Sequence, residues 1–211
     1  MRRRRDAYTR EAKKSGFPAH SVFKLQEIDQ RLQLLRKGQR VLDLGCYPGS
    51  WLLYACERVG PSGLVTGVDA QALRQALPPN GRFIQGDALG ESLREQLQGQ
   101  SFDVVLSDMA PWTSGHRDLD QTRSFELVMR ALAIASELLR PSGSFVAKIF
   151  QGPEFEEARA ALRRHFDKVR ILRPKATRSE SYETFLAGQG FRPPAEAPPE
   201  PSEAPPESTK S

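Results

Sequence analysis

Three short apolar runs of the sequence each end in an aspartate. The runs are LVTGVD (64–69), RFIQGD (82–87) and FDVVLSD (102–108), and their last residues are Asp69, Asp87 and Asp108. Runs of this length and composition predict buried strands. A single Asp at a strand end can be a turn residue or a helix cap, but three successive strands that end in Asp favour a binding site. The carboxylate of Asp69 can accept hydrogen bonds from ribose hydroxyls, and that of Asp87 from an adenine amino group.

The loop that follows the predicted strand at 40–45 indicates which ligand these carboxylates bind. It has the sequence Gly45-Cys46-Tyr47-Pro48-Gly49-Ser50-Trp51. A dinucleotide fingerprint needs a second glycine where Tyr47 stands, and a P-loop needs a Gly-Lys-Ser/Thr that this loop lacks. What remains is a tight turn into a helix N-terminus, which suits a small carboxylate and an adenosine better than a phosphate chain. Carboxylate, ribose and adenine together describe S-adenosylmethionine.

Strands alternate with helices along most of the chain, and this order predicts how the aspartates come together. Strands are expected at 40–45, 64–69, 82–87, 102–108, 143–150, 168–174 and 182–188, and helices at 21–35, 50–60, 91–98, 120–139 and 153–166. The alternation predicts an α/β fold with a mostly parallel seven-stranded sheet and helices on both faces. The last two strands have no helix-length segment between them, which predicts one antiparallel edge strand. Pro153 is expected in the first turn of the last helix.

The composition divides the 211 residues into three parts. Residues 1–16 form a basic N-terminal arm, residues 17–191 a single globular domain, and residues 192–211 a Pro- and Glu-rich tail whose lack of large apolar residues predicts disorder. Residues 1–40 hold twelve Lys and Arg but only four Asp and Glu. This basic end is expected either to contact a polyanion such as nucleic acid or to be a solvated tail.

Other features exclude several classes of protein. No apolar run approaches the ~18 residues that a membrane-spanning helix needs, and the arginine-rich start lacks the apolar stretch of a secretory signal. Two cysteines, Cys46 and Cys56, are too few for a disulfide framework. The three histidines are scattered, so no metal site is expected. We expect a monomeric, cytoplasmic protein without membrane association.

Several longer motifs resemble those of the FtsJ/RlmE-type ribosomal RNA 2′-O-ribose methyltransferase family, over about residues 6–190. The matching segments are VFKL (22–25), DLGCYPGSW (43–51), LSDMAPWTSG (106–115), GSFVAKIFQGPEF (143–155) and SYETF (181–185). Several motifs in the family's order are far more specific than one glycine loop. The resemblance implies a Rossmann-like, S-adenosylmethionine-dependent methyltransferase fold for residues 17–191.

The resemblance also implies a Lys-Asp-Lys-Glu catalytic tetrad. Carried over motif by motif, the tetrad falls on Lys24, Asp108, Lys148 and Glu183. Glu180 competes with Glu183 for the last place. The spacing back from Gly190 favours Glu183, which also shares a strand face with the aromatic Phe185.

Within this tetrad, Lys148 is the expected proton acceptor. A ribose hydroxyl is a weak acid and needs a group that takes its proton as the methyl arrives. Lys148 lies inside an apolar run, where an unpaired lysine costs several kcal/mol, on the order of the buried-charge penalty. Lys24 is either a second cation of the site or a solvated residue on the face of the first helix. Asp108 and Glu183 can orient the two lysines.

The cofactor site that the resemblance implies consists of loop and strand-end residues. They are Gly45, Pro48, Gly49, Ser50, Trp51, Asp69, Asp87, Ala88 and Asp108. Trp51 either fills the core or forms a wall of the cofactor site. We expect it to form a wall and to contact the cofactor mostly through its backbone. The sequence departs from the family at His20, Cys46-Tyr47, Ser50 and Trp112. Trp112 can stack on a base or be a rim aromatic without a role.

The expected activity is therefore S-adenosylmethionine-dependent methylation of a ribose 2′-hydroxyl in RNA, with a uridine of large-subunit (23S) ribosomal RNA as substrate. The basic arm and the first helix are expected to bind RNA phosphates. Transfer RNA or a cap remains open as the substrate. Two other activities remain open: methylation of a base, and RNA binding without catalysis on a retained fold. The complete tetrad argues against the last, and SDMAPW (107–112) differs from the Asn-Pro-Pro-Tyr-like loop common in base methyltransferases.

Overall fold

The computed structural model of the chain describes residues 10–12, 14–112, 114–177 and 181–193. Its strands are β1 (Arg40–Leu44), β2 (Leu64–Asp69), β3 (Gly81–Gln85), β4 (Phe102–Ser107), β5 (Leu139–Phe150), β6 (Phe166–Leu172) and β7 (Glu183–Phe191). Its helices are α2 (Val22–Leu32), α3 (Ser50–Val59), α4 (Glu91–Gln96), α5 (Arg117–Leu138) and α6 (Phe155–His165). Residues 1–9 of the predicted arm, and the predicted tail from residue 194 onward, lie outside the described residues.

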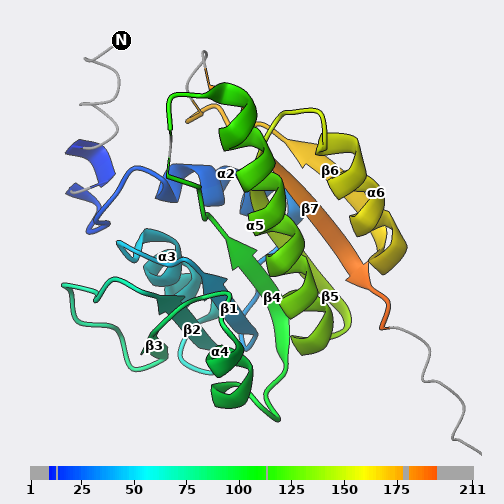
Figure 1. Cartoon of the computed structure of the whole chain (residues 1–211). Coiled ribbons are helices and arrows are strands. Elements are labelled where there is room, and N and C mark those ends of the chain that lie inside the picture. The colour runs from blue at the N-terminus through cyan, green and yellow to red at the C-terminus, as the bar shows by residue number, and fades with distance from the viewer. Residues whose placement is uncertain (1–9, 13, 113, 178–180, 194–211) are drawn as a thin grey trace, which may run out of the picture.

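A seven-stranded mixed sheet forms the centre of the molecule (Figure 1). The strand order is β3-β2-β1-β4-β5-β7-β6, and every pair from β3 to β5 is parallel. The predicted α/β fold with a mostly parallel sheet is confirmed. The antiparallel pairing falls at the expected side of the sheet, because β7 pairs antiparallel with both β5 and β6.

The antiparallel strand β7 lies between β5 and the edge strand β6. The burial of the two strands explains this order. β7 is buried over Thr184–Gly188, so it needs a neighbour on each side. β6 carries the exposed charged residues Asp167, Lys168 and Arg170, which suit an edge strand because charges there discourage pairing with other chains.

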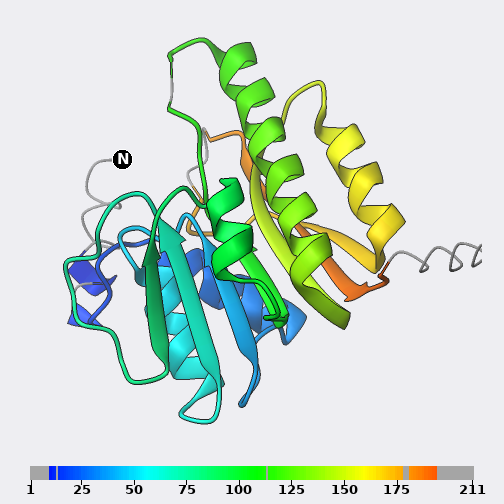
Figure 2. The ribbon, with the colours of Figure 1, turned by 60° about the horizontal axis from the view of Figure 1, so that its bottom comes forward.

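Helices cover both faces of the sheet, as predicted (Figure 2). On one face, α4, α5 and α6 bury Leu93, Leu132 and Leu162 in one apolar cluster. On the other face, α2 and α3 bury Leu25 and Leu52 in a second cluster. The apolar stripes of the helices thus lie against the sheet, and the two clusters form the core.

Several element boundaries differ from the sequence prediction by one to four residues, and the starts of β5 and α6 are two of them. Helix α5 ends at Leu138 and β5 begins at once at Leu139, four residues before the predicted start. Pro153 does not lie in the first turn of α6, because the helix begins only at Phe155. A separate turn precedes it, in which the N–H of Phe155 donates to the backbone oxygen of Gly152 (3.1 Å).

The topology brings candidate site residues to one edge of the sheet. Asp69 is the last residue of β2, Asp108 follows β4, and Lys148 stands two residues before the end of β5. Because β7 runs in the opposite direction, its first residue meets the same edge, where Glu183 lies opposite Phe150 of β5. The carboxyl ends of the parallel strands are where open α/β sheets bind ligands.

Part of the predicted arm contacts the globular part of the chain. Ala12 is fully buried and packs in the same apolar cluster as Phe17 and Val22. The division into arm, domain and tail remains a prediction. Among the helices of the described residues, none has both the length and the apolar character to cross a membrane.

Candidate active site

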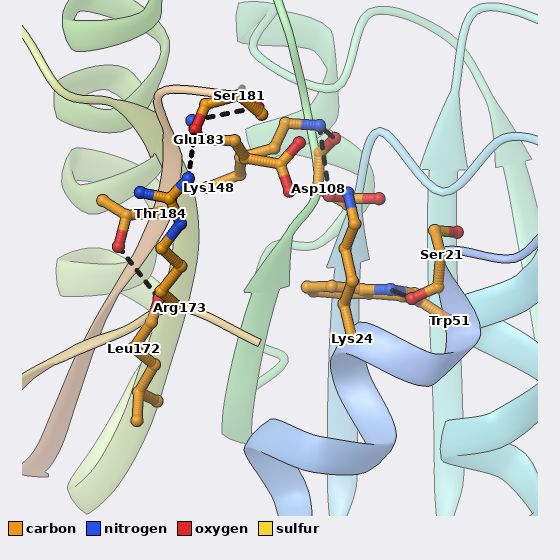
Figure 3. Close-up of polar contacts among 10 residues, drawn as sticks. All are labelled: Ser21, Lys24, Trp51, Asp108, Lys148, Leu172, Arg173, Ser181, Glu183 and Thr184. Atoms are coloured by element: carbon orange, nitrogen blue, oxygen red, sulfur yellow. Dashed lines mark hydrogen bonds and ion pairs between the residues drawn. The ribbon is translucent and has the colours of Figure 1, made fainter. Parts of the chain in front are cut away.

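Lys148, near the end of β5, is held by the residue that follows β4. Its ammonium nitrogen Nζ lies 3.1 Å from Oδ1 of Asp108 and 2.5 Å from the backbone oxygen of the same residue (Figure 3). The side chain of Lys148 is only 9% exposed, and its neighbours Ala147 and Ile149 are fully buried. The lysine is therefore buried but paired, so that Asp108 offsets the penalty for burying its charge.

A second ion pair joins the first helix to the last strand. Nζ of Lys24, in α2, lies 2.5 Å from Oε1 of Glu183, in β7. The two side chains are 11% and 13% exposed, and Nζ of Lys24 also lies 6.0 Å from the centre of the Phe185 ring. The alternative in which Lys24 is a solvated residue of a helix face is therefore wrong.

The two ion pairs lie together at the carboxyl edge of the sheet. Figure 3 shows the side chains of Lys24, Asp108, Lys148 and Glu183 gathered from four different elements. The pairing of β5 with β7 explains their proximity, because Lys148 stands opposite Phe185, two residues beyond Glu183. The structure thus brings together the four residues of the predicted tetrad. The competing Glu180 lies outside the described residues.

The glycine turn between β1 and α3 is closely packed. Gly45 and Gly49 have φ angles of 72° and 103°, in a region that other residues rarely adopt. A Cβ atom at Gly45 would lie 2.2 Å from Cγ of Met109. A Cβ atom at Gly49 would lie 2.2 Å from Nε2 of Gln75, which donates to the backbone oxygen of Pro48 (2.6 Å). Larger residues at the two glycines would push these neighbours away, and the N-terminus of α3 follows directly.

The strand-end aspartates hold the loops around this turn. Oδ2 of Asp69 accepts a hydrogen bond from the N–H of Tyr47 (2.9 Å), and Oδ1 accepts one from the N–H of Gln71 (2.8 Å). Oδ1 of Asp87 accepts a hydrogen bond from the N–H of Leu89 (2.9 Å), and Ala88 between them is buried. A carboxylate offers about four lone-pair positions, so both aspartates keep acceptor capacity for a ligand.

The side chains of Ser50 and Trp51 form hydrogen bonds with the backbone of the segment before α2. Oγ of Ser50 accepts a hydrogen bond from the N–H of Ala19 (2.8 Å). The indole Nε1 of Trp51 donates to the backbone oxygen of Ser21 (2.9 Å), and its ring lies 5.8 Å from that of Phe185. Both side chains are almost fully buried, which leaves the backbone of this stretch as the part that can meet a ligand.

Asp43 has no role that the sequence predicts, yet its surroundings in the structure make it a candidate site residue. Asp43 is fully buried in β1, and neither of its carboxylate oxygens has a hydrogen-bond partner among the described residues. Burial, and then the charges of Asp108 and Asp69, raise its pKa well above the ordinary value. Buried carboxylates are rarely left without partners, so Asp43 fits a ligand group that donates hydrogen bonds, such as an ammonium. Its signal in the sequence is an acid inside an apolar strand, two residues before Gly45.

The fold and the site together define a class of protein. A mostly parallel seven-stranded sheet with a tight glycine turn after β1 and acidic residues at successive strand ends is the arrangement of a Rossmann-like methyltransferase. The chain belongs to the FtsJ-like methyltransferase family, whose model matches residues 17–191. The resemblance seen in the sequence, and the enzyme class that it implies, are confirmed.

Individual relatives agree with this family. A protein of Sorangium cellulosum named ribosomal RNA large subunit methyltransferase E is 52% identical over 186 residues, which cover 88% of each chain. A protein of the same name from Oleidesulfovibrio alaskensis is 49% identical over 195 residues, covering 91% of this chain and 94% of its own. Among solved structures, one described as a ribosomal RNA methyltransferase from Plasmodium falciparum is similar, with a TM-score of 0.71 and 28% identity over 81% of this chain and 96% of that one.

Proposed function

We propose that the chain methylates a ribose 2′-hydroxyl in RNA, with S-adenosylmethionine as the methyl donor and a uridine of large-subunit ribosomal RNA as the substrate. The observation that carries the proposal is the buried Lys148 held by Asp108, beside the pair of Lys24 and Glu183. Such a set suits a reaction in which a hydroxyl group loses its proton. The names of the similar proteins from Sorangium cellulosum and Oleidesulfovibrio alaskensis support large-subunit ribosomal RNA as the substrate.

Each tetrad residue has a task that follows from its contacts. Lys148 first loses its own proton to solvent and then, as the neutral amine, accepts the hydroxyl proton. Asp108 fixes the direction of Nζ through its carboxylate and its backbone oxygen. Glu183 positions Lys24, which supplies a second positive charge to the site. Bound S-adenosylmethionine supplies a methyl group already activated on a sulfonium, so the main task of the protein is alignment.

The residues of the glycine turn and of the strand ends fit this cofactor. Asp69 would accept hydrogen bonds from the ribose hydroxyls, and Asp87 from the adenine amino group. The unpartnered carboxylate of Asp43 fits the ammonium group of the amino-acid part. The backbone around Gly45 and Gly49 would lie against the ligand, because glycines allow close approach.

Basic residues are the proposed contacts to the RNA backbone. We assign this role to the arm of residues 1–16 and to helix α2, since Lys and Arg bind phosphates and release counterions. We propose a monomer that acts in the cytoplasm on the large ribosomal subunit or on its RNA. The Pro- and Glu-rich tail of residues 192–211 has no part in this proposal.

The proposal is tested by identifying the methylated nucleoside. Purified protein and S-adenosylmethionine are incubated with large subunits, and separately with their naked RNA, from cells that lack the gene. The RNA is then digested to nucleosides and analysed by mass spectrometry. We expect 2′-O-methyluridine with the wild-type chain and none with Lys148→Ala, which serves as the matched control.

Other products would identify the alternatives. Methyl groups on a base would contradict the proposed chemistry, and a 2′-O-methyl nucleoside found only with transfer RNA or capped RNA would contradict the proposed substrate. Binding of large-subunit RNA without any transfer would favour a non-catalytic RNA-binding protein.

A further inference from the structure

Trp112 is far more exposed than the other large apolar side chains of the described residues. It is 91% exposed, whereas the next, Leu119, is 42% exposed. The only other tryptophan of the chain, Trp51, is 2% exposed. A tryptophan can bury 150–250 Å² of surface, on the order of several kcal/mol when packed. The exposure of so large an apolar side chain suggests that Trp112 binds a ligand or a partner.

The loop that carries Trp112 is held on both sides. Before it, the backbone oxygen of Asp108 accepts a hydrogen bond from Lys148, and the side chain of Met109 packs against Gly45. After it, the N–H and the hydroxyl of Ser114 both donate to Oδ1 of Asp120, at 2.8 and 2.9 Å. The pKa of Asp120 is lowered, first by the hydrogen bond from the N–H of Ser114. Contacts on both sides thus connect Trp112 to the body of the protein.

The position of Trp112 relates it to the candidate active site. It stands four residues after Asp108, so its Cα lies within about 14 Å of the Cα of Asp108, the reach of four extended residues. This loop is therefore within reach of an RNA strand whose ribose is placed at Lys148. Unpaired bases of RNA commonly stack on exposed aromatic side chains.

An arginine shortly after this loop in the chain points to the same ligand. The guanidinium of Arg117, at the start of α5, lies 5.3 Å from the centre of the Tyr182 ring. Tyr182 precedes Glu183, and its ring packs against Phe150 at 4.8 Å. No carboxylate of the described part of the chain forms an ion pair with Arg117. Its N–H donors are thus available for a phosphate, the group that arginine binds in a bidentate way.

We propose that Trp112 stacks on a base next to the methylated nucleotide and that Arg117 binds a phosphate of the same strand. This inference rests on the proposed function, and it adds a second RNA contact to the one proposed for the basic arm. The bound segment is single-stranded at this point, because a base in a duplex presents no free face to an aromatic ring.

The two tryptophans allow a direct test that does not depend on catalysis. Oligouridylate is added to the protein without cofactor, and the tryptophan fluorescence and its quenching by acrylamide are recorded. We expect the RNA to quench the emission and to protect it from acrylamide in the wild-type chain. In Trp112→Phe, which retains only the buried Trp51, neither effect should occur. An oligomer of the same length that lacks bases should bind without protecting Trp112.

Substitutions at Trp112 and Arg117 test the contribution to affinity. Trp112→Leu keeps an apolar side chain but has no aromatic face, so it should raise Kd for oligouridylate about 5- to 150-fold, the range for one stacked base. Trp112→Phe should retain most of the affinity. Arg117→Gln should lower the salt dependence of binding by about one phosphate contact. The control is Arg164→Gln, which removes an exposed arginine at the far end of α6 and should change neither quantity.

The outcomes separate this inference from the proposed function. If Trp112 stays accessible to acrylamide with RNA bound, or if Trp112→Leu binds like the wild type, the stacking contact does not exist, even if 2′-O-methyluridine is formed. If large subunits protect Trp112 from acrylamide but no RNA does, Trp112 contacts a ribosomal protein, and this result would overturn the proposal. Normal stacking without methyl transfer would instead contradict the proposed function.

Discussion

Nζ of Lys24 lies 2.5 Å from Oε1 of Glu183, although the two residues are 159 positions apart in the chain. The pair ties α2, at the start of the globular part, to β7, at its end. Both side chains are nearly buried, so the pair connects two elements and also fixes two charges beside Lys148 and Asp108. Its contributions to stability and to catalysis can be separated.

Lys24→Met should destabilise the protein, because it leaves the carboxylate of Glu183 without its partner. Loss of one partner from a fully buried pair costs about 3–5 kcal/mol, and we expect ~2 kcal/mol here because some solvent reaches the site. The double variant Lys24→Met with Glu183→Gln should recover most of the free energy of unfolding, measured in urea, but not methyl transfer. Recovery of both would make the pair purely structural.

Asp43→Asn should stabilise the ligand-free protein and weaken cofactor binding. The substitution removes a buried charge without a partner, which costs on the order of 1–3 kcal/mol. It also removes the group that fits the ammonium of the cofactor, so affinity for S-adenosylmethionine should fall by about tenfold or more. Thermal unfolding and titration calorimetry measure the two effects, and unchanged affinity would remove Asp43 from the cofactor site.

The stabilisation by Asp43→Asn should depend on pH. Burial and the neighbouring acids raise the pKa of Asp43 in the folded state, so the folded protein favours the protonated carboxyl. Below the unfolded value of about 3.9 Asp43 is neutral in both states. The penalty grows as the pH rises above that value and levels off once the pH passes the raised folded pKa. The difference in unfolding free energy between variant and wild type should therefore be largest near neutral pH and shrink in acid.

Asp69→Ala should weaken S-adenosylmethionine binding without unfolding the protein. Its carboxylate accepts hydrogen bonds from Tyr47 and Gln71, so the variant loses the ribose acceptor and loosens the loops at the same time. Asp69→Asn is the matched control, since its amide oxygen can still accept one loop hydrogen bond. We expect the Asn variant to bind better than the Ala variant but worse than the wild type in calorimetry. Wild-type affinity in both variants would contradict the assignment of Asp69.

The basic arm should contribute to RNA binding through counterion release. The variant replaces Arg2, Arg3, Arg4, Arg5, Arg10, Lys13 and Lys14 by Gln. Each phosphate contact that is lost should reduce the slope of log affinity against log salt by about 0.7–0.9, while affinity for S-adenosylmethionine stays unchanged. An unchanged slope would mean that the arm is a solvated tail.

The sequence was sufficient to predict the order of strands and helices, and the resemblance to a known family pointed to four tetrad residues that the fold brings together. The pattern and composition of apolar residues identify strands such as 64–69. Acidic residues at the strand ends point to the edge of the sheet where ligands bind. A lysine inside an apolar strand also stands out, because burying it without a partner is unfavourable.

Other features of the site depend on tertiary contacts that local patterns do not contain. The place of β7 beside β5 follows from which strand is buried on both sides. The tasks of Ser50 and Trp51 depend on hydrogen bonds to Ala19 and Ser21, about thirty positions away. Asp43 becomes a candidate only once its carboxylate is seen to be buried without a partner.

Lys148 is the residue on which the account depends, and the most direct measurement is single-turnover methyl transfer by Lys148→Ala and Lys148→Arg at saturating RNA and S-adenosylmethionine. Loss of a general base should lower the rate by about 100-fold or more in Lys148→Ala, while both ligands still bind. Lys148→Arg should be equally impaired, because a guanidinium stays protonated and cannot accept the hydroxyl proton. Near-wild-type turnover in Lys148→Arg would contradict the account, since a positive charge that only positions the ribose would then be enough.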